Sequence, residues 1–338
     1  MRASHRFFFL FLVALLAACV AVAAWLGFMA VTPGQIVTAI AARLGLTAET
    51  ATTATTIILD VRLPRILAAA LVGGGLAMAG GVFQAILLNP LADPYTLGIS
   101  SGAAFGASFA IVLSFTGLTF PGAVPLCAFL GALATLAAVF ALAGRDRDFS
   151  SNTLILAGII IAAILSAGIG FVQYLADRGV TAIVFWLMGS LVGRSWLDVG
   201  ILLLLSLPAS LIIFYYARDL NVMALGTATA GSLGVDTART RKLLLVSASL
   251  ITAASVAVAG IIGFVGLLVP HLLRFILGPD NRLLLPASFL SGAILLLLAD
   301  TLTRAVLPHE LPIGILTALI GGPVFCLIFY RQQTRLSR

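Results

Sequence analysis

The chain has 338 residues, of which 61% are hydrophobic and 9% are charged. Soluble globular proteins carry about 25% charged residues, so this composition excludes that class and predicts an integral membrane protein. The formal net charge of +7 does not indicate nucleic-acid binding, because the basic residues fall in short segments between apolar runs, as membrane topology requires.

Ten apolar runs follow one another along the chain, where a helix needs about 20 apolar residues to cross the hydrocarbon core of a bilayer. We therefore expect an all-α polytopic membrane protein with ten transmembrane helices in one domain, residues 1–338. The expected spans lie near residues 7–31, 64–88, 94–115, 121–143, 153–176, 197–217, 243–260, 261–277, 283–303 and 313–330.

The first run begins after two arginines and passes Leu16-Ala17-Ala18-Cys19, which resembles a lipoprotein signal. The run continues to Val31, however, and is longer than the apolar part of a signal peptide. We expect it to be retained as the first span. Its cysteine and the two others, Cys127 and Cys326, have no CxxC spacing, so we expect three buried thiols and no metal site.

The segments between the runs differ in kind. Residues 32–61 are rich in threonine, and we expect an outer loop without regular structure. Residues 89–93 predict a very short inner turn, because Pro90 and Pro94 interrupt the helix there. Residues 177–195 are too interrupted for a span and predict a half-helix near the outer surface. The long run 243–277 is divided at Gly260–Gly263.

The basic residues support this arrangement. If the N-terminus is inside, thirteen of the nineteen lysines and arginines fall on the cytoplasmic side and six fall outside. This bias agrees with the positive-inside rule, and it places both termini in the cytoplasm. Nine spans would move Arg331, Arg335 and Arg338 outside and weaken the bias.

The sequence contains no nucleotide-binding loop. A phosphate-binding GxxxxGK[ST] loop needs a lysine, and the only lysine, Lys242, follows Arg241. The acidic residues also avoid the middle of the spans, where ion coupling would require them. Asp300 lies toward the outer end of its run, within reach of Arg304 one turn later. We therefore expect no enzymatic activity, no cofactor, and an energy source in another subunit.

The longest cytoplasmic segment, residues 218–242, has the character of a docking surface. Its glycines separate two short helical pieces that carry several apolar residues. An apolar face on a loop is typical of an element that enters a groove of a partner. The alternative is a loop that packs on its own membrane domain.

Residues 62–102 carry the pattern RLPR, a small-residue run with Gly73–Gly75, and NPLADP before a second small-residue run. This block resembles the permeases of bacterial ABC importers for iron chelates, haem and vitamin B12 (FecCD-type), and the resemblance extends over most of residues 60–330. It implies a permease subunit in the bacterial inner membrane. The implied partners are an ATP-binding subunit dimer, an extracytoplasmic substrate-binding protein, a second permease copy in a homodimer, and lipid. Ferric siderophore is the first expected substrate, before haem or cobalamin.

The resemblance also implies roles for individual residues. Three groups match positions of the family: docking of the binding protein by Arg62, Arg65 and Arg304; coupling to the ATPase by Leu225, Gly226, Ala230, Leu233 and Gly234; and a cytoplasmic gate at Asn89, Leu91, Ser150 and Ser151. Thr227 and Ala228 stand where family members often carry acidic residues. A W-x-x-G-S-L…W pattern is matched by Trp186, Gly189, Ser190, Leu191 and Trp196.

Each implied role has a plainer alternative. The arginines can pair with Asp60 or Asp300 or extend toward the interface. Ser150 or Ser151 can cap a helix, and the tryptophans can anchor the chain at the membrane surface. For the whole chain, the rival functions are an ion-coupled transporter or channel, and a membrane scaffold without transport activity.

Overall fold

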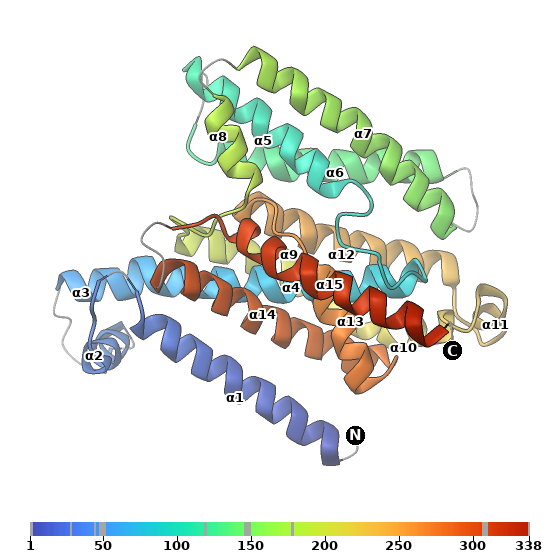
Figure 1. Cartoon of the computed structure of the whole chain (residues 1–338), viewed down its shortest axis with the longest axis horizontal. Coiled ribbons are helices and arrows are strands. Elements are labelled where there is room, and N and C mark those ends of the chain that lie inside the picture. The colour runs from blue at the N-terminus through green and yellow to red at the C-terminus, as the bar shows by residue number, and fades with distance from the viewer. Residues whose placement is uncertain are drawn as a thin grey trace.

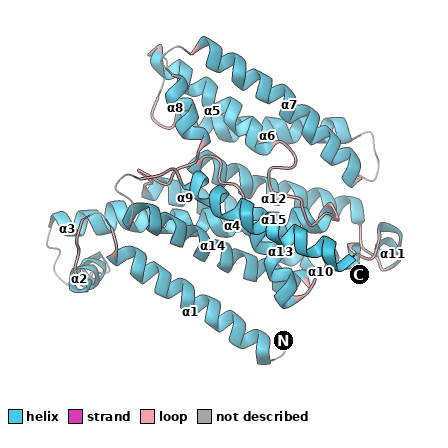
Figure 2. Ribbon diagram, in the orientation of Figure 1, coloured by secondary structure: helices cyan, strands magenta, loops and turns pink. Residues whose placement is uncertain are grey.

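The computed structural model describes residues 3–27, 29–43, 45–46, 52–117, 120–144, 150–176, 179–305 and 310–336, and these form helices joined by turns (Figures 1 and 2). The all-α prediction is confirmed. The helices are α1 Ala3–Trp25, α2 Pro33–Arg43, α3 Thr53–Thr56, the π-helix η1 Ile57–Arg62, α4 Leu63–Ile86, α5 Ile99–Phe115, α6 Ala123–Ala143, α7 Ser151–Leu175, α8 Val180–Leu187, α9 Trp196–Tyr215, α10 Ala217–Met223, α11 Thr227–Ser232, α12 Thr237–Ala259, α13 Val265–Leu277, α14 Asn281–Ala305 and α15 Ile313–Leu336.

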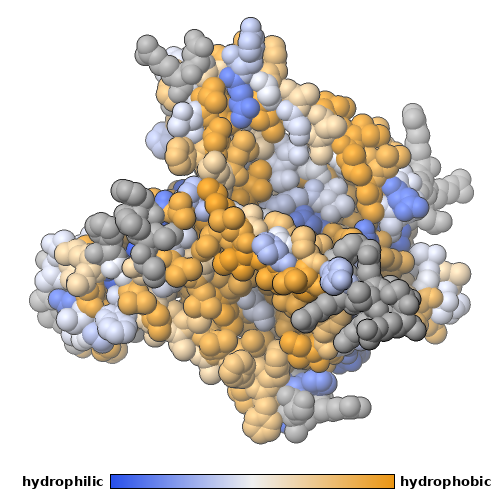
Figure 3. All heavy atoms as spheres, in the orientation of Figure 1, coloured by the Kyte–Doolittle hydropathy of each residue, from blue (hydrophilic) through white to orange (hydrophobic). Residues whose placement is uncertain are grey.

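Seven helices of the described chain are long and apolar enough to cross a membrane. Three shorter apolar helices, Ile99–Phe115, Val265–Leu277 and Ile313–Ile328, coincide with the remaining runs of the sequence. The chain is therefore a polytopic membrane protein. Figure 3 shows that apolar residues cover most of the face presented there, as lipid or partner contact requires.

α4 is the central helix of the molecule. It is packed by α14, α12, α13 and α9, and the α5–α7 group forms a separate layer against α12 (Figure 1). Small residues make this possible, because a helix gains nothing from burying apolar surface against lipid and must rely on close contact. A Cβ atom at Gly80 would lie 1.8 Å from the carbonyl oxygen of Gly266, and one at Gly73 would lie 2.3 Å from that of Gly292. Close contact of backbones thus fixes α13 and α14 against α4.

The predicted division of the run 243–277 is confirmed. α12 ends at Ala259 and is followed by Gly260, which has φ +70°, and α13 begins after Phe264, which has φ +67°. A bulky residue in the left-handed region is unusual. Here the side chain of Phe264 fills the space that a side chain at Gly321 would need, since a Cβ there would lie 2.4 Å from that of Phe264. The Tyr95 hydroxyl donates to the Ile262 carbonyl at 2.8 Å and so holds the extended segment between the two helices.

The prediction that residues 32–61 lack regular structure is wrong for most of the described part. α2 begins with a reciprocal cap: the Thr32 amide donates to Gln35 Oε1 at 2.9 Å, and the Gln35 amide donates to Thr32 Oγ1 at 3.3 Å. Pro33 occupies the first helical position, where its missing N–H costs nothing. Thr52 caps α3, which continues through η1 into α4, so the second span begins well before residue 64.

Two further expectations need correction. The inner turn is longer than residues 89–93, because α4 ends at Ile86 and α5 begins only at Ile99. Asp93 Oδ1 accepts the Tyr95 amide at 2.5 Å and holds this connection in a turn. Of the three free cysteines Cys19 is buried and Cys127 half-buried, but Cys326 is exposed, since it lies on a face of α15 that no other described part of the chain covers.

Candidate functional site

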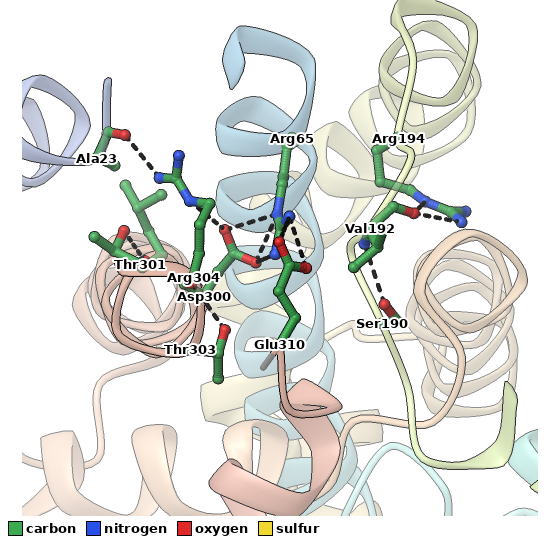
Figure 4. A network of polar contacts seen from close by, with 11 residues as sticks. Ala23, Arg65, Ser190, Val192, Arg194, Asp300, Thr301, Thr303, Arg304 and Glu310 are labelled. Atoms are coloured by element: carbon green, nitrogen blue, oxygen red, sulfur yellow. Dashed lines mark hydrogen bonds and ion pairs between the residues drawn. The ribbon is translucent and has the colours of Figure 1, made fainter. Parts of the chain in front are cut away.

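The three arginines predicted to dock a binding protein line one cavity, but all three side chains are buried. Figure 4 shows Arg65 and Arg304 with their partners inside the chain. Arg62 and Arg65 come from the junction of η1 and α4, and Arg304 from the last turn of α14. Their exposed fractions are only 4%, 8% and 6%. A buried cation needs partners, and each of them has internal ones.

Arg62 and Arg304 hold the C-terminal end of α1. Arg62 Nη1 donates to the carbonyl oxygens of Ala24 and Trp25 at 2.7 and 3.0 Å, and Arg304 Nη2 donates to that of Ala23 at 2.7 Å. The last carbonyls of a helix have no partner within the helix and carry its negative dipole end, so two cations satisfy both needs. These side chains therefore fix α1 to α4 and α14.

Arg65 lies between two carboxylates (Figure 4). Its Nε donates to both oxygens of Asp300 at 3.0 and 3.2 Å, and its Nη1 donates to both oxygens of Glu310 at 3.2 and 3.1 Å. The Asp300 side chain is 1% exposed, whereas that of Glu310 is 39% exposed. Asp300 thus forms the buried ion pair, and Glu310 forms the outer one.

The predicted pairing of Asp300 with Arg304 is present but long, with 3.9 Å between Nε and Oδ2. Arg65 is the main partner of Asp300, although 235 residues separate the two along the chain. Asp60, the other carboxylate considered for these arginines, is exposed and makes no ion pair with a described residue. A cavity of about 160 Å³ lies over the cluster, lined by Met29, Ile57, Val61, Arg62, Arg65, Arg304 and Glu310. The docking role of the arginines stays a prediction.

The segment 218–242 contains the two short helices that its sequence predicts, α10 and α11. Gly226 and Gly234, with φ +105° and +85°, allow the sharp turns that follow them. Leu220, Met223 and Ala230 are buried against the rest of the chain, whereas Leu225 and Leu233 are 67% and 63% exposed. One side of the segment therefore packs on the membrane domain and the other presents two uncovered leucines. The coupling role of Leu225, Gly226, Ala230, Leu233 and Gly234 stays a prediction.

A polar cluster that the sequence analysis missed joins α10 to the start of α14. Asn221 Nδ2 donates to Asp280 Oδ1 at 2.7 Å, and Asn221 Oδ1 accepts both the backbone amide and the Nδ2 of Asn281 at 2.8 Å. Asn281 is only 2% exposed. We call these three residues the α10–α14 clasp. The Gly278-Pro279-Asp280-Asn281 turn before α14 was the signal in the sequence.

The predicted gate residues lie at helix ends: Asn89 and Leu91 follow α4, and Ser150 and Ser151 are at the start of α7. Ser151 Oγ donates to the carbonyl of Ile86, the last residue of α4, at 3.3 Å. Asn89 Oδ1 accepts the Leu91 amide at 2.9 Å, and Leu91 is 44% exposed. Ser150 accepts the Thr153 amide and caps α7, as the plainer alternative held. Their part in a gate stays a prediction.

The predicted outer half-helix is α8. The residues after it form hydrogen bonds to the end of α12 and to the start of α15. The Ser190 amide donates to the Ala259 carbonyl at 2.7 Å, and the Ile313 amide donates to the Gly189 carbonyl at 3.1 Å. Trp196 Nε1 donates to the Leu59 carbonyl at 2.9 Å, which ties α9 to η1. Arg194, which carried no predicted role, donates to the Val258 carbonyl. These contacts give Gly189, Ser190 and Trp196 of the W-x-x-G-S-L…W pattern partners within the chain.

The described residues contain no group of three or more His, Cys, Asp or Glu side chains that could hold a metal ion. The site thus consists of an ion-pair cluster at one end, an exposed apolar segment at the other, and tightly packed apolar helices between them. This combination is typical of a polytopic membrane protein that binds partners at its two ends.

The chain belongs to the FecCD transport family, which matches residues 15–331. It is 44% identical over 283 residues to the cobalamin import system permease protein BtuC of Halobacterium salinarum, covering 84% of this chain and 76% of the relative. It is 42% identical to the hemin transport system permease protein HmuU of Yersinia pestis, with 82% and 84% covered. A solved structure described as an inward-facing metal-chelate type ABC transporter matches with a TM-score of 0.83 at 34% identity, covering 95% of this chain and 97% of that one. The predicted resemblance to ABC importer permeases is confirmed, and the family is one of non-enzymatic transport subunits.

Proposed function

We propose that this chain is the permease subunit of a binding-protein-dependent ABC importer that carries an iron chelate, such as a ferric siderophore, or a related large chelate such as haem or cobalamin. The observation that carries the proposal is the pair of exposed leucines, Leu225 and Leu233, on the segment between α9 and α12. Two large apolar side chains exposed in the turns that follow α10 and α11 fit the groove of a partner, in this case an ATP-binding subunit.

The opposite end fits a soluble binding protein. The cavity over Arg62, Arg65 and Arg304 is closed on one side by Glu310, the most exposed member of the cluster. A carboxylate of the binding protein can replace Glu310 on Arg65, because a charge-assisted pair of the same kind forms in exchange. Docking then breaks the outer ion pair between Arg65 and Glu310 and leaves the buried Arg65–Asp300 pair intact.

The membrane arrangement follows from the same proposal. Ten spans with both termini in the cytoplasm place the 218–242 segment inside and the arginine cluster outside, in the inner membrane of a bacterium. The outward faces of α7 and α15 carry exposed apolar residues such as Ile159, Ile164, Leu319 and Leu327. A second copy in a homodimer would face them across a two-fold axis that encloses the passage. ATP binding in the partner would shift the populations of inward- and outward-open states.

Reconstitution tests this proposal. Proteoliposomes that hold the permease, its cognate ATPase with ATP, and the binding protein on the other side should accumulate a chelate when offered ferric siderophore, hemin or cyanocobalamin. The permease alone should give no uptake against a gradient. Accumulation by the permease alone under a proton or sodium gradient would establish the rival, an ion-coupled transporter.

A further inference from the structure

The α10–α14 clasp joins the 218–242 segment to the first residue of α14, and α14 leads from there to the arginine cluster. α14 begins at Asn281, inside the clasp, and continues for 25 residues to Ala305, which is about 37 Å at the rise of an α-helix. Its outer end carries Asp300 and Arg304, which belong to the arginine cluster. A single helix therefore connects the segment with the exposed leucines to the cluster that lies over the opposite end.

The first turn of α14 depends on the clasp for its position. Pro286 has no N–H to donate to the carbonyl four residues earlier, so this turn is joined to the rest of the helix by one hydrogen bond fewer. The Asp280 side chain accepts the Arg282 amide at 3.0 Å as well as Asn221 Nδ2. Asn221 thus holds both the residue that caps α14 and the buried first residue of the helix, Asn281.

Beyond this turn, α14 is held firmly against α4. A Cβ at Gly292 would lie 2.3 Å from the carbonyl oxygen of Gly73, and one at Gly74 would lie 2.8 Å from the ring of Phe289. Packed surfaces of this kind move as bodies rather than deform. A displacement that enters α14 at the clasp therefore reaches Asp300 and Arg304.

We infer that Asn221 is a positioning residue that makes α14 follow the 218–242 segment, so that the state of the ATPase reaches the binding-protein side through the α10–α14 clasp. This inference rests on the proposed function and adds the path by which its two partners communicate. Asn221 suits the task because one amide side chain serves as donor to α14's cap and as acceptor for α14's first residue.

The test exchanges the hydrogen-bond donor and acceptor at positions 221 and 280. It is carried out in the complete complex of permease, ATPase and binding protein. Asn221→Asp keeps the acceptor for Asn281 but sets a carboxylate against Asp280. Asp280→Asn alone keeps the bond, because Asn221 still donates to the side-chain oxygen of the new residue. The double variant Asn221→Asp with Asp280→Asn restores the bond with donor and acceptor exchanged. The measurement is the stimulation of ATP hydrolysis by the binding protein, beside basal hydrolysis and retention of the ATPase during purification.

We expect Asn221→Asp to lower the stimulation by at least about fivefold, the lower range of an allosteric coupling. Basal hydrolysis and ATPase retention should stay near wild type, Asp280→Asn should behave like wild type, and the double variant should recover the stimulation. Full stimulation in Asn221→Asp, or no recovery in the double variant, would overturn the inference while leaving the proposed function in place. A wild-type complex without any stimulation would overturn both.

A second measurement covers the case in which Asn221→Asp does not assemble. Leu302 is 43% exposed on α14 beside the cluster, so in a background without Cys19, Cys127 and Cys326 a spin label at Leu302→Cys in each permease copy of the complex reports the position of the outer end. ATP should change the distance between the two labels in the wild-type background and leave it unchanged with Asn221→Ala. An equal change in both backgrounds would refute the role of Asn221.

Discussion

Glu310 is the residue of the arginine cluster with most contact to solvent, and it holds Arg65 from outside. Glu310→Gln removes its charge and leaves Arg65 more available to a carboxylate of the binding protein. Because an exposed ion pair is worth about 0.2–1 kcal/mol, we expect the dissociation constant for the binding protein to fall about 1.4- to fivefold. Surface plasmon resonance on the permease in nanodiscs measures this dissociation constant. Asp60→Asn, which removes an exposed charge from η1 without breaking an ion pair with a described residue, is the matched control, and equal effects of both variants would count against docking at Arg65.

Asp93 gives a prediction about pH. Burial raises the pKa of the Asp93 carboxyl, in the connection between α4 and α5, to about 6. The usual value is about 3.9, so the ionised form is disfavoured in the folded state. This cost is absent below about pH 4, grows between pH 4 and 6, and is complete above pH 6. Asp93→Asn keeps the acceptor for the Tyr95 amide without the charge.

The Asp93→Asn variant should therefore melt at a higher temperature than wild type at pH 7.5 and at the same temperature at pH 4. Thermal unfolding in detergent at a series of pH values measures the difference. A difference that does not change between these pH values would show that the Asp93 charge carries no cost in the fold.

The sequence identified Arg62, Arg65 and Arg304 as a set and offered Asp300 as a partner, but it did not reveal Glu310 or the carbonyls of α1. Arg65 meets Glu310 across 245 residues of sequence, and Arg62 meets backbone carbonyls of α1. Backbone carbonyls exist at every position, so no residue type marks an acceptor of this kind. Local pairing rules reach only three or four residues along a helix, which is why Asp300 was assigned to Arg304 and not to Arg65.

At the scale of elements, the glycines of α4 determine how closely its neighbours approach. Gly80 has no room for a side chain, because a Cβ would overlap the Gly266 carbonyl, whereas Gly170 on α7 has open space. We expect Gly80→Ala to destabilise the protein by about 2 kcal/mol or more, as overpacking does. Gly170→Ala should be neutral or stabilise by up to about 1 kcal/mol, because alanine is the better helix former. Thermal unfolding of the two variants in the same detergent checks this, and equal melting temperatures would refute the packing argument.

The boundaries of helices were predictable where an apolar run ends at a helix-breaking residue. They were not predictable where capping hydrogen bonds determine the start of a helix. The break at Gly260–Gly263 and the half-helix α8 were both expected from composition. The helix α2 was missed, although Thr32, Pro33 and Gln35 form the starting pattern of a helix. Threonine-rich composition suggested a loop, but two reciprocally hydrogen-bonded residues, Thr32 and Gln35, with a proline at the first helical position outweigh composition.

At the scale of the whole molecule, apolar content and loop charge were enough to predict the class, since a bilayer admits few architectures. The way the helices surround α4 was beyond the sequence, because small residues occur in most of the apolar runs and do not say which pairs meet. The sequence likewise did not predict that the apolar faces of α7 and α15 are exposed in the single chain, because this depends on which helices pack against them.

The ten-span arrangement makes a prediction that separates it from nine spans. It places Thr38 of α2 outside and Thr229 of α11 inside, and both residues are exposed. In a background without Cys19, Cys127 and Cys326, an impermeant maleimide should label Thr38→Cys in intact spheroplasts and label Thr229→Cys only after permeabilisation. A reporter fused to the C-terminus should stay protected in intact cells. Nine spans would keep the first two results but expose the C-terminal reporter, because α15 would then begin and end on the outer side. The reporter therefore decides whether the chain returns to the cytoplasm, as the thirteen basic residues assigned to that side require.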